Sequence, residues 1–305
     1  MADGKGGGLS KYPISFNICQ VVINAHGGIF DDTVRTLHGA LVDLGYPCSV
    51  NENVFVPGAV NIALGGTMHM DTVPGLAEQM GRQPFVLYQF EQLNPDHGFL
   101  QTHPGYEGVM NAATHILEYS HVGMAHMRAR GEAAKTSFLP PSYHRSLEVF
   151  RPAEEPELQV AFYGTLSDRR VALIERLREA GVQVFTIFGV YGEDLHRHLR
   201  RAQIILNVHG HPAMNVLETV RLSFLLANRC CVVSETSDHN PYGEGVAFAD
   251  YDRLVETCVA YLAAPEKREA LAAEGYLAVR RSDFVNDLRR VIDELPLEAL
   301  TRTGG

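Results

Sequence analysis

Two stretches of the chain share one pattern, in which an apolar run stops at glycine and a helical pattern follows. In the first, the run at 18–25 leads to Gly27 and Gly28; in the second, the run at 158–163 stops at Gly164. Runs that are apolar throughout are typical of strands covered on both faces, and their alternation with helices predicts parallel sheets with right-handed crossovers. The sequence therefore predicts an α/β fold of two Rossmann-like domains whose parallel sheets face a cleft.

A charged, proline-punctuated segment at 151–157 separates the two stretches and is typical of a linker. It predicts an N-terminal domain over 12–150 and a C-terminal domain over 151–280. The Gly-rich residues 1–11 are expected to form a flexible tail. The remaining residues, 281–305, include an amphipathic helical segment.

The N-terminal domain contains one segment whose periodicity indicates a helix. Apolar residues recur at helical spacing between Val109 and Leu117 and predict a helix there, followed by a looser stretch at 128–141. Before it, the apolar run at 85–90 predicts a strand that Glu91 follows. These expectations place Glu91 at the carboxyl end of a strand.

Charge and composition narrow the class of partner. With 26 Lys and Arg against 36 Asp and Glu, the formal net charge of -10 argues against a nucleic-acid partner. No apolar run approaches the ~20 residues that a membrane span needs, and residues 1–12 lack the apolar core of a signal peptide. The five cysteines form no CxxC pair, which fits reduced thiols and a cytoplasmic location. The sequence carries no signal for an oligomeric state.

Ligands of parallel sheets bind at the carboxyl ends of the strands, so the residues there are the candidates for a site. His26, Gly27 and Gly28 follow the first strand. Two glycines let the backbone approach a ligand closely, and their N–H groups can face an oxyanion. His26 can act as a base near neutral pH. A tight turn around a packed histidine explains the same residues equally well.

Two further segments suit a phosphorylated ligand. Residues 164–170 combine backbone N–H groups, two hydroxyls and two arginines at a helix start, which suits a diphosphate. The alternative is that Ser167 or Asp168 caps the helix and the arginines are solvated. Glu218 and Arg221 share a helix face, where the carboxylate can accept sugar hydroxyls and the guanidinium can meet phosphate. An ion pair within the helix is the alternative for them.

No motif supports a metal or a dinucleotide cofactor. The pairs His196-x-His198 and His209-x-His211 lack a third ligand at a convincing spacing, so no metal site is predicted. The GxGxxG fingerprint, the P-loop, GxSxG and HExxH are all absent from the sequence.

Three runs of the second half, at 205–209, 217–222 and 226–235, resemble the donor half of GT-B glycosyltransferases. Within that fold they are most similar to the group 1 and CgeB-like branch. The run at 88–93 resembles the acceptor half of the same branch. The resemblance covers about two-thirds of the chain and is strongest over 158–250. It implies a glycosyltransferase of the hexosyltransferase type that needs no cofactor or metal. It also implies a nucleotide-diphosphate sugar as donor and a small molecule or saccharide as acceptor.

The resemblance also implies roles for the candidate residues. His26 and Glu91 would serve catalysis on the acceptor side, and the segment 281–305 would cross back to the N-terminal domain. The residues expected to bind the donor are Gly27, Gly28, Gly164, Thr165, Arg169, Gly189, Tyr191, His209, Asn215, Glu218, Arg221 and Glu235.

One departure leaves alternatives open. Many retaining relatives carry two glutamates separated by seven residues, and here Gly210 stands where the partner of Glu218 would be. Retention and inversion both stay open: His26 is the natural base of an inverting enzyme, and binds donor or acceptor in a retaining one. A nucleotide-sugar epimerase and a non-catalytic nucleotide-binding protein are the alternative functions.

Overall fold

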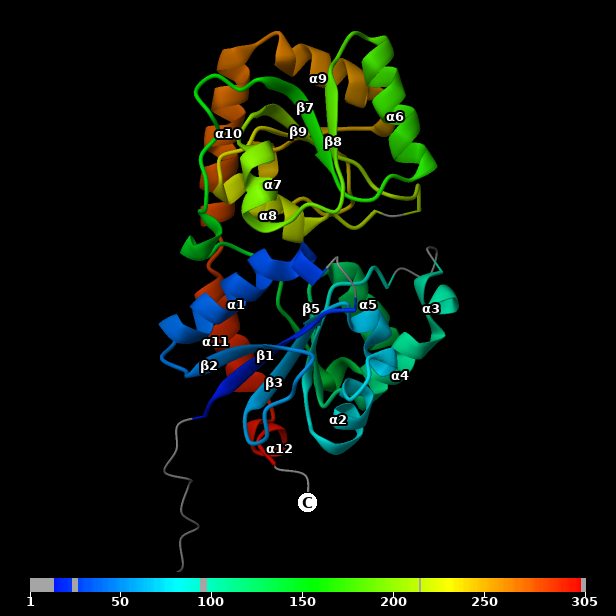
Figure 1. The fold of residues 1–305 in the computed structure, drawn as a ribbon, viewed down its shortest axis with the longest axis vertical. Helices are drawn as coiled ribbons and strands as arrows, with labels where there is room; N and C mark the ends of the chain where they lie inside the picture. Colours follow the sequence, from blue (N-terminus) through cyan, green and yellow to red (C-terminus); the bar gives the residue numbers. More distant parts are fainter. Residues whose placement is uncertain (1–13, 24–26, 94–97, 214, 303–305) are drawn as a thin grey trace, which may run out of the picture.

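The computed structural model describes residues 14–23, 27–93, 98–213 and 215–302 (Figure 1). The expected tail at 1–11 and His26 lie outside the described residues. Two sheets are present, all of their described pairings are parallel, and helices pack around each. The predicted α/β fold of two domains is confirmed.

The N-terminal domain is built on a sheet with the strand order β2-β1-β3-β4-β5-β6. Its strands are β1 (Phe16–Val21), β2 (Cys48–Glu52), β3 (Val60–Gly65), β4 (Val86–Gln89), β5 (His115–Glu118) and β6 (Thr136–Phe138). Its helices are α1 (Asp31–Asp43), α2 (Leu76–Arg82), α3 (Phe99–Thr102), α4 (Pro104–Ala112) and α5 (His121–Ala129).

The C-terminal domain is built on a sheet with the strand order β11-β10-β9-β7-β8. Its strands are β7 (Leu158–Tyr163), β8 (Val184–Ile187), β9 (Ala202–Asn207), β10 (Val232–Glu235) and β11 (Ala247–Ala249). Its helices are α6 (Asp168–Glu179), α7 (Gly192–Leu199), α8 (Thr219–Ala227), α9 (Leu254–Leu262) and α10 (Pro265–Arg280). In each sheet the first strand of the domain lies between the next two, which puts a ligand-binding crevice at its carboxyl end.

Strand β1 shows why the predicted strands are apolar at nearly every position. Phe16 and Ile18 pack into the core on one face of the sheet, while Cys19 and Val21 pack into the core on the other face. Both faces are therefore removed from water, and the strand needs apolar residues at nearly every position.

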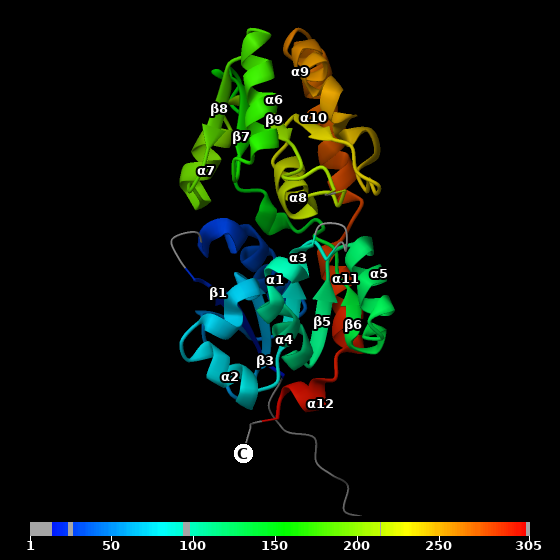
Figure 2. The same cartoon turned by 90° about the vertical axis from the view of Figure 1, so that its right-hand side faces the viewer.

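The last helices pack on the N-terminal domain, although they follow the C-terminal domain in sequence. Helix α11 (Phe284–Glu294) lies beside α1 and the first sheet, and α12 (Leu297–Leu300) follows it (Figure 2). Phe284, Leu288 and Ile292 of α11 enter the same core as Phe16 and Ile18. Asp283 begins the helix by accepting hydrogen bonds from the backbone N–H groups of residues 285 and 286. The chain thus passes between the domains twice.

One predicted element is wrong. The helix expected between Val109 and Leu117 is divided, because α4 ends at Ala112 and β5 begins at His115. Glu118, the last residue of β5, is fully buried, and it accepts hydrogen bonds from Gln89 Nε2 at 2.7 Å and from the backbone N–H of Ser120 at 2.8 Å. A strand of four residues with polar ends shows no apolar run, so its pattern merges with that of the preceding helix. The looser stretch expected at 128–141 contains β6.

No helix in the described part of the chain combines the length and the apolar character that crossing a membrane requires.

Candidate active site

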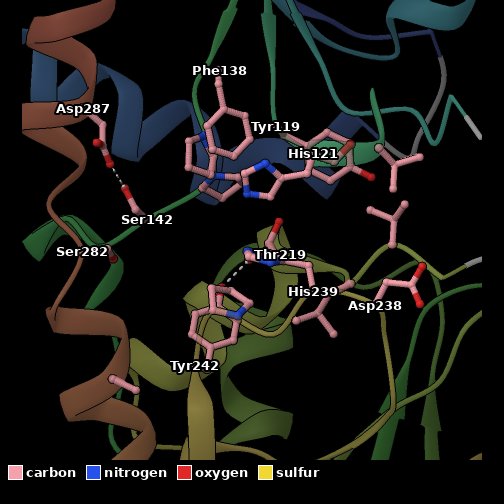
Figure 3. A pocket seen from close by; sticks show the side chains of 18 of the residues that line it. Tyr119, His121, Phe138, Ser142, Thr219, Asp238, His239, Tyr242, Ser282 and Asp287 are labelled. Carbon is pink, nitrogen blue, oxygen red and sulfur yellow. Dashed lines mark hydrogen bonds between the residues drawn. The ribbon is translucent and has the colours of Figure 1, made fainter. Parts of the chain in front are cut away.

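Two cavities lie between the domains, where the carboxyl ends of both sheets meet. Cavity A, of about 450 Å³, lies between Phe30 and Phe90 of the N-terminal domain and Gly164, Arg170 and Glu218 of the C-terminal domain. Cavity B, of about 330 Å³, is lined by residues that include His121 and Phe138 of the N-terminal domain and Asn215, His239 and Tyr242 of the C-terminal domain (Figure 3). Tyr119 and Thr219 line both cavities. The two cavities are therefore neighbours in one cleft.

Cavity A collects half of the residues that the resemblance assigned to the donor. Those that line it are Gly164, Thr165, Gly189, Tyr191, Glu218 and Arg221. Gly189 has a φ of +69°, in the left-handed region, and turns the chain from β8 toward α7. Its neighbour Phe188 is 60 % exposed, which leaves an aromatic face at this end of the cavity.

The two glycines after β1 allow close packing, within the N-terminal domain at Gly27 and across the cleft at Gly28. A Cβ on Gly28 would lie 2.7 Å from Tyr191 Cβ of the other domain, so only glycine fits there. A Cβ on Gly27 would meet the Val22 side chain at 2.7 Å. Gly28 thus lies at the contact between the domains, and both glycines belong to the same helical turn, Gly27–Phe30, as Ile29 and Phe30, which line cavity A.

Glu218 is held as a carboxylate at the start of α8. Its oxygens accept hydrogen bonds from Asn207 Nδ2 at 2.8 Å and from His209 Nδ1 at 3.1 Å. Burial by itself raises the pKa of this carboxyl, but the bond and charge of His209, the charge of Arg221 and the bond from Asn207 outweigh it and bring the pKa to about 2. Arg221 donates to Asn207 Oδ1 at 3.0 Å. In place of the alternative, an ion pair within the helix, both side chains thus bond to β9 or to the turn after it.

His209 is the positive partner of Glu218. While Nδ1 faces Glu218, Nε2 lies 3.0 Å from the carbonyl oxygen of Thr236 and 3.1 Å from Ser237 Oγ. A carboxylate and a carbonyl oxygen can only accept, so both ring nitrogens donate and the ring is an imidazolium. Burial lowers the pKa of His209, but Glu218, Thr236 and Glu235 raise it above its usual value. The ring therefore holds Glu218 in place.

Arg169 and Glu235 form an ion pair. Arg169 Nη1 donates to Glu235 Oε2 at 2.6 Å and its Nη2 donates to Glu235 Oε1. The guanidinium also lies 3.8 Å from the centre of the Tyr251 ring. Glu235 accepts a further bond from the backbone N–H of His209 at 3.1 Å. The pair lines neither cavity and ties the turn after β9 to the end of β10.

Arg170 lines cavity A, although the resemblance assigns only its neighbour Arg169 to the donor. It donates to the carbonyl oxygen of Val208 at 2.7 Å and to that of Thr165 at 2.9 Å. Burial and the charge of Arg221 lower the pKa of this guanidinium to about 10. The adjacent arginines were a signal for a cationic helix start, but the rotation of α6 decides which of them points into the cavity.

Arg221 comes from the opposite side of cavity A. Its guanidinium stacks 4.6 Å from the centre of the Tyr163 ring. A Cβ on Gly164, whose φ is +124°, would lie 2.9 Å from Arg221 Nη2, so this glycine leaves room for the guanidinium. Two positive groups thus converge at the turn after β7.

The remaining candidates lie elsewhere. Glu91 follows β4, and burial raises its pKa to about 7, but it lines neither cavity. Asn215 lines cavity B and donates a hydrogen bond to Asp238. His26 lies outside the described residues, so its catalytic role stays a prediction. Within the described residues, no group of three or more His, Cys, Asp or Glu side chains is arranged to hold a metal ion.

Comparison with known proteins gives one family match and two relatives of known sequence. Residues 145–289 match the family model described as glycosyl transferase-like. Two uncharacterised proteins of Acanthamoeba polyphaga mimivirus are 29% and 28% identical over 112 and 142 residues, which is 35% and 44% of this chain. The matched parts are 37% and 16% of those proteins, so the chain spans only a minor part of their length.

Solved structures share the fold at low identity. HepE of Anabaena in complex with UDP superposes with a TM-score of 0.53 at 13% identity, over 92% of this chain and 99% of that one. The T4 phage protein BGT with its substrate UDP-glucose gives 0.59 at 10% identity, over 92% and 100%. WaaG, a glycosyltransferase involved in lipopolysaccharide biosynthesis, gives 0.59 at 12% identity, over 93% and 100%.

These matches agree with the parallel sheets, the interdomain cleft and the resemblance seen in the sequence. The chain has the GT-B fold of glycosyltransferases, and its residues 145–289 match the glycosyl transferase-like family.

Proposed function

We propose that this protein is a glycosyltransferase that moves a hexosyl group from a nucleotide-diphosphate sugar to a small-molecule or saccharide acceptor. The observation that carries the proposal is the convergence of Arg170 and Arg221 beside Glu218 in cavity A. A cytoplasmic location is part of the proposal, since all five cysteines are free thiols.

The two guanidiniums leave positive charge for a ligand. Arg170 bonds to carbonyl oxygens and Arg221 bonds to an amide oxygen, which are neutral acceptors. The lowered pKa of Arg170 reflects burial next to a like charge. A diphosphate would neutralise both groups through charge-assisted hydrogen bonds, and these bonds would strengthen as negative charge develops on the leaving group. We therefore propose that the guanidiniums supply this charge and that turnover needs no metal.

Glu218 and the aromatic end of the cavity complete the proposed donor site. Because its pKa is about 2, the Glu218 carboxylate is acceptor-only at neutral pH and suits two ribose hydroxyls. Phe188 and Tyr191, at the far end of the cavity, provide faces for a nucleobase. The nucleotides in the HepE and BGT complexes support a ligand of the same class here.

The test is calorimetric titration of the protein with UDP, GDP, TDP, CDP, ADP and NAD, with and without EDTA. One nucleoside diphosphate should bind, and Arg170→Ala and Arg221→Ala should each weaken it about 10- to 100-fold, because each removes a charge-assisted contact. Arg178→Ala, an exposed position on the same helix as Arg170, is the matched control and should bind like the parent protein.

Each other result points elsewhere. Binding of NAD alone, or of no diphosphate, contradicts the proposal. Conversion of the donor sugar without an acceptor would identify an epimerase, and binding with neither transfer nor hydrolysis would identify a nucleotide-binding protein. Loss of turnover in EDTA would contradict the metal-independent part alone.

A further inference from the structure

Cavity B adjoins the proposed donor site but contains none of its charged groups. Its walls come from the turn into α5, from the segments 215–219 and 238–242, and from the two interdomain crossings at 140–142 and 281–282. Tyr119 and Thr219, which Figure 3 labels, line this cavity and cavity A as well. A molecule in cavity B would therefore lie next to a sugar that projects from cavity A.

Aromatic rings from both domains line cavity B. The His121 ring stacks on Phe138 with centroids 4.5 Å apart and planes at 30°. His239, from the other domain, meets His121 edge-on at the same centroid distance and at 78°. Tyr119 and Tyr242 also line the cavity. Rings in this arrangement favour a flat or ring-shaped partner with an apolar face.

The ionised groups of cavity B already have partners. Asp287 accepts a hydrogen bond from Ser142 Oγ at 3.2 Å. Asp238 accepts one from Asn215, and Arg281 pairs with Glu274 at 2.7 Å. Asp287 also pairs with Arg290 at 3.8 Å, and Asp238 is exposed to water. Because these charges are paired or solvated, the cavity suits an uncharged ligand and contrasts with cavity A.

Two buried polar atoms at the boundary of the cavities still need partners. Across the part of the chain that the structure describes, neither Asn215 Oδ1 nor Thr219 Oγ1 has a hydrogen-bond partner. Buried polar atoms are almost always hydrogen-bonded, so two neighbouring acceptor atoms without partners point to a ligand that carries a hydroxyl group.

We propose that cavity B is the acceptor chamber, that it takes an uncharged ring compound with a free hydroxyl, and that His121 accepts the proton of that hydroxyl. This inference rests on the proposed function, since it assigns the second substrate of the same cleft. A pyranose and a phenol share this chemistry.

The reaction is then a direct displacement. The hydroxyl oxygen forms a bond to C1 of the donor sugar, while the bond from C1 to the diphosphate oxygen breaks and its electron pair leaves with the nucleoside diphosphate. The hydroxyl proton moves to the imidazole of His121 and then to solvent. Because the hydroxyl attacks from the face opposite the diphosphate, the configuration at C1 is inverted.

His121 is suited to this role by its surroundings. Burial and the neighbouring charges of His239 and Arg128 lower its pKa below the usual 6.5, so the ring is neutral at physiological pH. Its side chain is exposed to the cleft. His209, in contrast, has both nitrogens committed and cannot accept a proton.

The first experiment compares His121→Gln with His126→Gln, a histidine on the same helix that lines neither cavity. The His121 variant should keep the donor Kd and lose at least 100-fold in kcat, and the parent's decline in rate at acidic pH should disappear. The His126 variant should match the parent. An unchanged kcat in His121→Gln, or a 100-fold loss in His26→Gln instead, would overturn the assignment of the base.

The second experiment tests the chamber by itself. Methyl pyranosides and simple phenols are titrated into the donor-loaded protein by saturation-transfer NMR, which distinguishes the two sources of the ring. Val122→Phe narrows cavity B from helix α5 and should abolish acceptor binding while the donor Kd stays the same. If neither class binds, or if Val122→Phe binds like the parent, the chamber is refuted. Failure of donor binding would instead refute the proposed function.

Discussion

At the scale of single residues, the cleft is organised by a charged pair. His209 and Glu218 are hydrogen-bonded to each other. Glu218 also accepts a hydrogen bond from Asn207 on β9, and His209 also contacts the carbonyl oxygen of Thr236 after β10. His209 is 2 % exposed, so its positive charge has little help from water. The conformation of the turn between β9 and α8 therefore depends on Glu218 being ionised.

Glu218→Gln should lower the free energy of unfolding by about 2–3 kcal/mol at pH 7, because it leaves a buried imidazolium without its counter-charge. The contribution of Glu218 is present above its unfolded pKa, near 4.5, and is lost as pH falls toward 2. The contribution of His209 is complete below pH 6.5 and is lost as pH rises through its raised pKa. Urea unfolding between pH 2 and 9 measures both effects, that of Glu218 below pH 5 and that of His209 above pH 6.

Glu244→Gln, an exposed carboxylate of the same domain, is the control and should change stability by less than about 0.5 kcal/mol. Adding His209→Asn to Glu218→Gln should recover part of the loss, since the unpaired charge is then absent. Equal stability of Glu218→Gln and the control would contradict the charged pair.

At the scale of secondary structure, helix α5 packs tightly against the end of strand β5. Ser120 begins α5 by accepting a hydrogen bond from the backbone N–H of Gly123 at 2.9 Å. Gly123 faces the buried carboxyl of Glu118, and a Cβ at this position would overlap that group. This glycine therefore sets how closely the helix that carries His121 approaches the sheet.

Gly123→Ala should destabilise the protein by about 1–3 kcal/mol, because Glu118 is buried and cannot move away. The matched control is Gly108→Ala in helix α4, where an added Cβ meets nothing within 4 Å. That control should stabilise by about 0.5–1 kcal/mol, as alanine favours a helix. Thermal unfolding of both variants tests the prediction, and destabilisation of equal size would contradict the packing argument.

The same elements show how far the sequence predicts the structure. Strands buried on both faces, such as β1 and β7, are evident because nearly every residue is apolar. Strand β5 is missed because Glu118 is polar and its burial depends on Gln89, a residue distant in sequence. The cleft follows from the alternation of strands and helices, and six of the residues expected to bind the donor line cavity A. The inward direction of Arg170 and the whole of cavity B depend on how the elements pack, which local periodicity does not encode.

At the scale of the whole molecule, two domains with separate cores share one cleft. The C-terminal helix α11 belongs to the core of the N-terminal domain, which it reaches through Phe284, Leu288, Val291 and Ile292. These residues recur along one face of the helix, so the segment carries its own docking stripe. The N-terminal domain is therefore discontinuous in sequence.

Leu288→Ala should cost about 2–4 kcal/mol, because it leaves a cavity in a fully packed core. Arg289→Ala, the exposed neighbour on the same helix, should have almost no effect. Hydrogen exchange should show faster opening of β1 and β3, with β7 and β9 unchanged. Faster exchange confined to the second sheet would contradict this placement of α11.

The position of α11 also has a consequence for synthesis. A ribosome makes β1 early, yet the helix that covers part of this sheet is made only after the C-terminal domain is complete. The first domain should therefore remain partly open while more than a hundred residues are added, and the second domain should be the first to close its core. A chaperone that binds exposed apolar surface would find its target in the N-terminal domain of the nascent chain.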